Sequence, residues 1–255
     1  MTSFSDYVQK QAMSPGELPV VHTTKYYRLP AIQASNMLHA ATCKVFKEPL
    51  LYFFYGRPAY RDDSQIMPTR DIGFYPICFV FRGSGIGSKA KRVFPFDTGA
   101  GQSGLYEPAI KKNVAVSDYQ LLTAVESARK IVGGFFDTDE KYLSNNPKSG
   151  LVFSSTEAPA QSYYQLINGG GDPECDDRYS AVEIQLGSNI DIRDDIMAVV
   201  LPTSFLDDDQ LAETILKTWR AEPLTYDAVI GMRPLEFHGA IRLLIRQFYQ
   251  RQGFV

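Results

Sequence analysis

Pro49-Leu50-Leu51-Tyr52-Phe53-Phe54-Tyr55-Gly56-Arg57-Pro58 is the stretch of sequence that decides the fold. Its apolar and aromatic run, 50–55, has the length and composition of a β-strand buried in a sheet. Arg57 follows this run beyond Gly56, so a charged side chain lies just past the end of a buried strand. The stretch therefore predicts a strand with an arginine directly after it.

Further strands and helices are predicted on both sides of this run. A first strand, 18–21, is expected to end at His22, since Pro19 is tolerated near a strand start. Other strands are expected at 75–82, 92–96, 179–186 and 196–201. Helices are expected over 27–37 through Pro30, from the capping box at 117–120 to Gly133-Gly134, from Asp207-Asp208-Asp209, and from Pro234.

The remaining segments set the domain organisation. The glycines of the Gly83–Gly87 segment are expected to form a flexible turn, and 137–177 is expected to be rich in loops. The chain shows no internal repeat and no linker long enough to divide it. We therefore predict an N-terminal arm over 1–17 and a single α+β domain over 18–255.

Composition indicates an ordinary soluble protein with much sheet. The chain has 255 residues, which is enough to bury a substantial core, and its 44% hydrophobic and 22% charged residues are typical of globular domains. The 15 Tyr and 16 Phe favour half-buried strands. A net charge of -3 argues against a protein that coats nucleic acid through bulk electrostatics.

Cysteines, histidines and hydropathy bear on location and metals. Cys43, Cys78 and Cys175 are far apart, which predicts reduced thiols and a cytoplasmic protein. The three histidines have no metal-ligand spacing, so no metal site is expected. Neither an apolar stretch near 18 residues nor a leader pattern is present, so we expect neither a membrane span nor a signal peptide.

Three polar residues in strand contexts suggest a common site. His22 comes at the end of the first predicted strand, Arg57 after a second, and Glu183 inside a third. That order suits nicotinamide dinucleotide chemistry. Each residue also has an ordinary structural interpretation, since His22 could be a satisfied strand-end histidine and Arg57 a surface ion pair. Glu183 lies between two apolar neighbours, so we expect it on the opposite, exposed face of its strand.

Several short motifs, in this order, resemble DarT-type ADP-ribosyltransferases. The segments are Val21-His22-Thr23-Thr24, Leu29-Pro30-Ala31-Ile32, 49–58, Val93-Phe94-Pro95-Phe96-Asp97-Thr98-Gly99-Ala100, Arg178-Tyr179-Ser180-Ala181-Val182-Glu183-Ile184 and Ala198-Val199-Val200-Leu201-Pro202. The resemblance covers about a third of the chain. It implies a split-sheet core with flanking helices, NAD as co-substrate without a metal, and a macromolecular acceptor, either nucleic acid or protein. It also implies a toxin or defence effector with an inhibitory partner.

The resemblance also assigns roles to the three residues and their neighbours. Glu183 would stabilise the oxocarbenium-like transition state, align the acceptor, or do both. Arg57 would act with it at the catalytic centre by holding the pyrophosphate or the acceptor.

NAD itself would be held by residues of the first two predicted strands. His22 would bond the adenosine-side ribose, Thr23 or Thr24 would orient the nicotinamide amide, and Tyr52, Phe54 or Tyr60 would stack on a planar ring. Strand aromatics are more often core residues, so the stacking role is the weaker of these assignments.

The acceptor surface is predicted from charge. The glycine-rich 82–112 segment carries Arg82, Lys89, Lys91, Arg92, Lys111 and Lys112, which would favour phosphate or acidic groups unless they form an ordinary solvated surface. After Arg57 the chain continues Pro-Ala-Tyr-Arg, where the family usually has apolar residues. Modification of DNA therefore does not follow from the resemblance.

Two other functions compete with this hypothesis. The first is a non-catalytic member of the same fold that binds a nucleotide or a protein partner. The second is a dimeric aspartic protease that uses Asp97 of the string Asp97-Thr98-Gly99-Ala100, with Ile131-Val132-Gly133 as its downstream apolar segment. The chain has one copy of that string, and the helix expected over 117–132 suits such a protease poorly.

Overall fold

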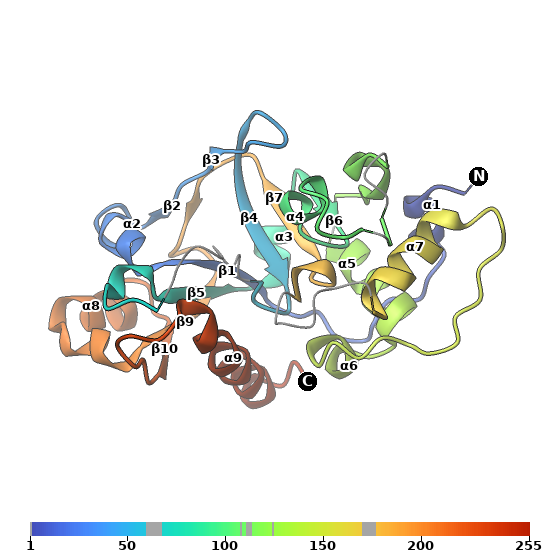
Figure 1. Ribbon diagram of the computed structural model, residues 1–255. Helices are drawn as coiled ribbons and strands as arrows, with labels where there is room; N and C mark the ends of the chain where they lie inside the picture. The colour runs from blue at the N-terminus through green and yellow to red at the C-terminus, as the bar shows by residue number, and fades with distance from the viewer. Residues whose placement is uncertain (1, 60–67, 108, 111–113, 124, 170–176) are drawn as a thin grey trace.

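A mixed sheet of eight strands forms the centre of the computed structural model, which describes residues 2–59, 68–107, 109–110, 114–123, 125–169 and 177–255 (Figure 1). The strand order within those residues is β10-β9-β5-β1-β4-β7-β6, with β3 paired to β4. The strands are β1 (Val20–Lys25), β3 (Ala41–Thr42), β4 (Pro49–Tyr55), β5 (Pro76–Phe81), β6 (Arg92–Phe94), β7 (Glu183–Leu186), β9 (Ile196–Pro202) and β10 (Glu222–Tyr226). β2 (Met37–Leu38) and β8 (Ile190–Asp191) form a separate pair. Only β9 and β10 run parallel among these pairs of the described chain.

The sheet divides between β1 and β4. β1 pairs with β5 along all its residues, but with β4 only at Val20↔Tyr55 and Val21↔Phe54. Beyond these two pairs the strands diverge, and β4 and β7 stand away from β1 and β5 (Figure 1). The divergence leaves two half-sheets, β10-β9-β5-β1 and β4-β7-β6, that are joined at one end.

Helices surround the two half-sheets. They are α1 (Phe4–Gln9), α2 (Leu29–Ser35), α3 (Gly83–Gly87), α4 (Thr98–Gln102), α5 (Val125–Ile131), α6 (Asp139–Leu143), α7 (Ala158–Ile167), α8 (Asp209–Glu213) and α9 (His238–Gln252). α9 packs against β9 and β10, while α1, α5, α6 and α7 gather at the opposite end of the molecule (Figure 1). The predicted α+β class is confirmed, and α2, α9 and most predicted strands lie where the sequence places them.

The segment expected to be an N-terminal arm is packed into the core. Ser3 caps α1 by accepting a hydrogen bond from the Asp6 backbone N–H at 3.0 Å. Phe4 and Val8, one turn apart, are fully buried, and the Phe4 ring lies 5.4 Å from that of Tyr163 in α7. The first helix therefore contributes to the same core as the sheet.

The capping box at 117–120 does not start the helix predicted there. Val116–Tyr119 forms a single 3-10 turn, and the helix proper is α5. The Leu121 backbone N–H instead donates to the Val93 carbonyl at 2.9 Å and so adds this segment to the free edge of β6. Pairing at the sheet edge therefore overrides the local capping pattern.

The Gly83–Gly87 segment is a helix and not the predicted flexible turn. Its glycines serve close packing, since a Cβ at Gly83 would lie 2.7 Å from the Leu18 carbonyl and one at Gly87 would lie 2.0 Å from Val125 Cγ2. α6 and α7 lie in the region expected to be loop-rich, and β10 was not predicted. Pro223 inside β10 is compatible with an edge strand, where an N–H is not needed on the open side.

Because α1 is buried, we expect it to contribute to the free energy of unfolding. Phe4→Ala should lower the free energy of unfolding by about 3–5 kcal/mol, because a fully buried ring is removed and a cavity remains. Met13→Ala, at a side chain that is 45% exposed, should change it by less than about 0.5 kcal/mol. Urea denaturation of both variants measures this, and equal stability would show that residues 1–17 are an independent arm.

Candidate functional site

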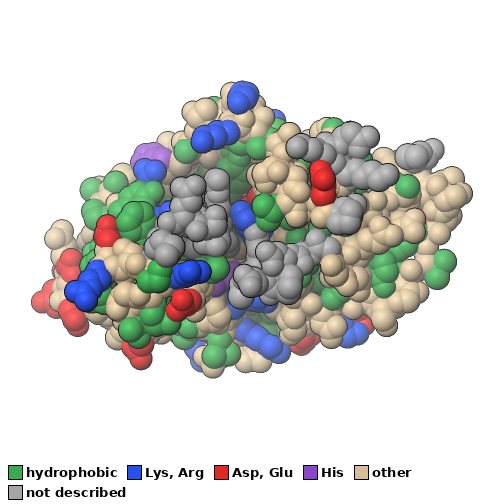
Figure 2. Space-filling view, viewed as in Figure 1, with side chains coloured by type: hydrophobic (Ala, Val, Ile, Leu, Met, Phe, Trp, Pro, Cys, Tyr) green, Lys and Arg blue, Asp and Glu red, His purple; other side chains and the backbone are tan. Residues whose placement is uncertain are grey.

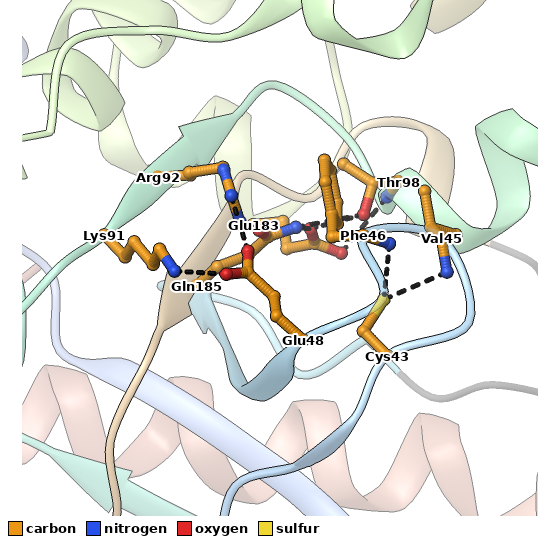
Figure 3. A network of polar contacts seen from close by, with 9 residues as sticks. All are labelled: Cys43, Val45, Phe46, Glu48, Lys91, Arg92, Thr98, Glu183 and Gln185. Atoms are coloured by element: carbon orange, nitrogen blue, oxygen red, sulfur yellow. Dashed lines mark hydrogen bonds and ion pairs between the residues drawn. The ribbon is translucent and has the colours of Figure 1, made fainter.

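Glu183 is the centre of a buried polar cluster (Figure 3). Its Oε2 accepts a hydrogen bond from the Thr98 backbone N–H at 3.1 Å, and its Oε1 accepts from the Thr98 hydroxyl at 2.8 Å. Gln185 Nε2 donates to the same Oε1 at 2.6 Å. Both carboxyl oxygens therefore have a partner at the start of α4, and Oε1 has a second one in β7 itself.

The expectation that Glu183 is exposed is wrong. Its side chain is only 1% exposed, because β4 and β6 pair with β7 on both edges and the Asp97-Thr98 segment covers its face. Burial and the nearby charge of Asp97 raise the pKa of Glu183 to about 8, against the opposing effect of the hydrogen bonds from Gln185 and Thr98. The carboxyl is therefore largely protonated at neutral pH.

A second layer of charged groups surrounds this cluster. Gln185 Oε1 accepts from Arg92 Nη1 at 3.3 Å, and Glu48 forms ion pairs with both Arg92 and Lys91 (Figure 3). The hydrogen bonds from Lys91 and Arg92 hold the pKa of Glu48 below its ordinary value. Lys89 lies 3.6 Å from Asp194. Three cations of the predicted acceptor surface are thus paired with carboxylates, while Lys111 and Lys112 lie outside the described residues.

The described side chains on the face shown in Figure 2 form no large basic patch. Lys and Arg side chains are interspersed there with Asp and Glu, and acidic side chains gather at the end where α8 lies (Figure 2). Asp207, Asp208 and Asp209 are exposed at this end, and Asp208 caps α8. The acidic run therefore serves the helix N-terminus, as predicted.

His22 lies where β1 and β4 diverge. Its Nδ1 is 2.8 Å from the Tyr52 carbonyl oxygen, and its ring contacts those of Phe53 and Phe79. A carbonyl only accepts, so Nδ1 carries the proton in this bond. Burial lowers the pKa of His22, which leaves the ring neutral at pH 7 with Nε2 as an acceptor. No other described residue is hydrogen-bonded to Nε2.

The residues predicted to hold NAD beside His22 have separate surroundings. Thr23 Oγ1 lies 3.3 Å from Cys78 Sγ, and Thr24 follows it along the partly buried end of β1. The pKa of the Tyr52 hydroxyl is raised far above its usual range, mainly by burial and to a smaller extent by a hydrogen bond with Cys43. Tyr60 lies outside the described residues.

Arg57 is buried, so its interpretation as a surface ion pair is wrong. Gly56, with φ at +69°, turns the chain at the end of β4 and brings the arginine under α6. The guanidinium is 1% exposed, stacks on the Tyr142 ring at 4.4 Å and donates from Nη2 to the Ser180 hydroxyl at 2.8 Å. Ser180 precedes Glu183 on the way into β7, so both predicted catalytic residues lie along the β4–β7 pair.

The strand register places Glu183 and His22 on opposite faces of the sheet. Glu183 shares its face with Phe54 and with the side chain of Tyr52, whereas His22 shares the other face with Phe53. Tyr52 links them, because its carbonyl bonds His22 and its side chain lies within the electrostatic influence of Glu183. The structure thus gathers these residues around β4, with Glu183 and His22 on opposite faces of the sheet.

Thr98 and Gln185 are hydrogen-bond partners of Glu183 that the sequence interpretation missed. Strand alternation is the signal that could have found Gln185, since it lies two residues after Glu183 on the same face. Thr98 could not be found this way, because its contact with Glu183 spans 85 positions. Asp97 caps α4 by accepting from the Ala100 N–H at 2.7 Å. The segment 131–133 that a protease would need as a strand is helical.

Comparisons with known proteins give no relative. No family model, no curated protein and no solved structure matches the chain. Among the described residues, no three His, Cys, Asp or Glu side chains gather closely enough to hold a metal ion. None of the helices in that part of the chain has the length and apolar character needed to cross a bilayer.

The raised pKa of Glu183 predicts a pH-dependent stability. Between its ordinary pKa of 4.5 and about 8, the folded state keeps a proton that the unfolded state releases, so stability falls as pH rises through this window. Glu183→Gln mimics the protonated carboxyl and should remove this fall. Between about pH 5 and about pH 8, the free energy of unfolding of the wild type should fall by roughly 3 kcal/mol more than that of Glu183→Gln.

Denaturation midpoints across this pH range measure the effect. Glu222→Gln is the matched control, since Glu222 is an exposed strand carboxylate that pairs with Arg251 at the surface. Its profile should parallel the wild type. Parallel profiles for Glu183→Gln as well would show that Glu183 is ionised in the folded protein at neutral pH.

Proposed function

We propose that this protein is an NAD-consuming ADP-ribosyltransferase that modifies a macromolecular acceptor. The observation that carries the proposal is the buried carboxyl of Glu183, whose pKa is raised to about 8, on the half-sheet next to the divergence of β1 and β4. Buried ionisable groups with strongly shifted pKa values concentrate at functional sites. The split of the sheet also supports an ADP-ribosyltransferase-like fold.

The chemistry assigns Glu183 an electrostatic role. Breaking the bond between nicotinamide and ribose develops positive charge on the ribose, which a carboxylate stabilises. The nicotinamide ring is itself cationic, so its arrival beside Glu183 favours loss of the carboxyl proton. Thr98 and Gln185 would hold the resulting carboxylate in place by the hydrogen bonds they already make. Because Glu183 is 1% exposed, the proposal requires the surroundings of the carboxyl to open for substrate while Thr98 and Gln185 keep their bonds to it.

His22 supplies the recognition of a ribose. As a neutral ring whose Nδ1–H is used by the Tyr52 carbonyl, it offers Nε2 to a hydroxyl donor. Thr23 and Thr24 follow on the same edge of β1, which no longer pairs with β4 and so exposes backbone donors and acceptors to a ligand. Tyr52, which borders both His22 and Glu183, would contact the nicotinamide-side ring.

A non-catalytic role in the same fold is the second candidate. It is favoured by the full set of hydrogen bonds to both Glu183 oxygens, since a structural carboxyl that joins α4 to β7 would look the same. The two functions differ in what the loss of the carboxylate does. A structural carboxyl affects stability alone, whereas a catalytic one affects turnover when the fold is intact.

The biological setting follows from the proposed activity. The acceptor would be nucleic acid or protein, and an NAD-consuming enzyme of this kind fits a toxin or defence effector held in check by an inhibitory partner. Cys43 and Cys78 are buried free thiols, which supports a cytoplasmic location.

Loss of the carboxylate should abolish activity. Purified protein is incubated with labelled NAD and cell lysate, and both nicotinamide release and label on macromolecules are measured. Glu183→Gln should lose at least about 100-fold in rate, as expected when a main electrostatic contribution is removed, while Glu222→Gln retains the wild-type rate. Nuclease and protease treatment of the product identifies the acceptor. Nicotinamide release by Glu183→Gln at the wild-type rate would refute the catalytic assignment.

The tautomer of His22 predicts that two substitutions of this residue, to Asn and to Ala, will differ in their effect on stability while both weaken NAD binding. Asn places an N–H donor where His22 has Nδ1, so His22→Asn keeps the bond to the Tyr52 carbonyl and loses only the acceptor at Nε2. NAD affinity measured by calorimetry should fall about 10-fold, which corresponds to one neutral hydrogen bond. His22→Ala should also lower the melting temperature, since it leaves that carbonyl unpaired. Unchanged NAD affinity in both variants would assign His22 a structural role.

A further inference from the structure

A cavity lined by arginines opens beside the end of β4, apart from the Glu183 cluster. Its volume is about 200 Å³, and it lies between α6, α9 and the turn that follows β4. The described residues that line it are Gly56, Arg57, Pro58, Leu143, Ser144, Arg242, Leu243, Ile245 and Arg246. Three of these are cations and none is acidic. The lining therefore presents an excess of positive charge.

Arg57 is a buried cation whose donors are incompletely used. Among the described residues, its Nε and Nη1 have no hydrogen-bond partner, although the side chain is 1% exposed. No carboxylate of the described chain pairs with it either. A buried charge without a counter-charge is strongly destabilising, and a buried donor without a partner adds to that cost. Within the described part of the chain, the Arg57 guanidinium therefore lacks a counter-charge.

The guanidinium is held in a fixed orientation. It stacks on Tyr142, whose hydroxyl donates to the Tyr55 carbonyl at 2.8 Å and accepts from the Val182 N–H at 3.0 Å. Its Nη2 bonds Ser180, which in turn donates to Asn145 Oδ1 at 2.8 Å. Pre-orientation of this kind reduces the entropy lost when a ligand binds.

Two further arginines come from α9. Arg242 and Arg246 are one helical turn apart and partly buried, so both can reach the same ligand. Arg242 Nη2 donates to the Leu143 carbonyl at 3.1 Å, and Arg246 Nη1 lies 3.4 Å from the Ser144 hydroxyl. These contacts anchor both side chains against the end of α6, at the border of the cavity.

We infer that this cavity binds a phosphate group. Arginine clusters recognise phosphate through several charge-assisted hydrogen bonds, and Arg57 offers unused donors for them. The cavity is smaller than the roughly 300–1,000 Å³ of pockets that enclose whole ligands, so it takes one phosphate or pyrophosphate group while the rest of the ligand stays outside. Neither Glu183 nor His22 lines it, so the inference stands whether or not the protein cleaves NAD.

Phosphate titrations of the full chain test the inference. In chloride buffer at constant ionic strength, inorganic phosphate or pyrophosphate should raise the melting temperature of the wild type in a concentration-dependent way. Arg246→Gln should weaken the affinity measured by calorimetry about 10-fold, because one charge-assisted contact is lost. Arg251→Gln is the matched control on the same helix, since Arg251 pairs with Glu222 outside the cavity and should leave the affinity unchanged.

Arg57→Met gives an independent result. It should abolish phosphate binding and, in phosphate-free buffer, melt at or above the wild-type temperature, because an uncompensated buried charge has been removed. Displacement of phosphate by ADP-ribose would identify a nucleotide pyrophosphate as the source, and independent binding of the two would identify free phosphate or a phosphomonoester. The inference is overturned if neither anion shifts the wild-type melting temperature, or if Arg246→Gln binds them with unchanged affinity.

Discussion

The hydrogen bond between His22 Nδ1–H and the Tyr52 carbonyl marks the point on which the rest of the structure depends. β1 and β4 pair at two positions only, and a longer ladder would close the sheet into a continuous surface. Where the ladder stops, a backbone carbonyl would be left without a donor, and the imidazole satisfies it. The divergence therefore persists without an orphaned polar group, and it leaves an edge of β1 available for a ligand.

In the Glu183 cluster, burial and hydrogen bonding have opposite effects on the protonation of one carboxyl group. Hydrogen bonds from Thr98 and Gln185 favour the carboxylate, whereas burial and the proximity of Asp97 favour the protonated acid. Burial prevails, so the resting state is neutral and fits a closed interior. A cationic ligand would reverse that balance without any change in the protein's own groups. Under the proposed function, the same arrangement would provide a neutral carboxyl for folding and a charged one for the reaction.

The sequence predicts the elements that depend on local periodicity, and it fails where contacts between distant segments decide the structure. Apolar runs located β4, β5 and β9, and alternation placed Glu183 on the face opposite Ile184. What covers that face is set by Thr98, which no local pattern connects to β7. The surface ion pair considered as the alternative for Arg57 is wrong because nothing near it in the chain reveals Tyr142 or Ser180 as partners. The capping box near 117 failed for the same reason, since the free edge of β6 competes for Leu121.

The closure of the arginine-lined cavity by α9 has a consequence for the order of synthesis. His238 Nε2 is hydrogen-bonded to the Pro58 carbonyl at 3.1 Å across 180 positions of the chain. The end of β4 therefore leaves the ribosome long before the helix that completes its surroundings, and during that interval the Arg57 guanidinium remains hydrated. Contacts of such sequence separation form slowly. The surroundings of Arg57 are therefore completed only by α9, which is made after every strand of the sheet.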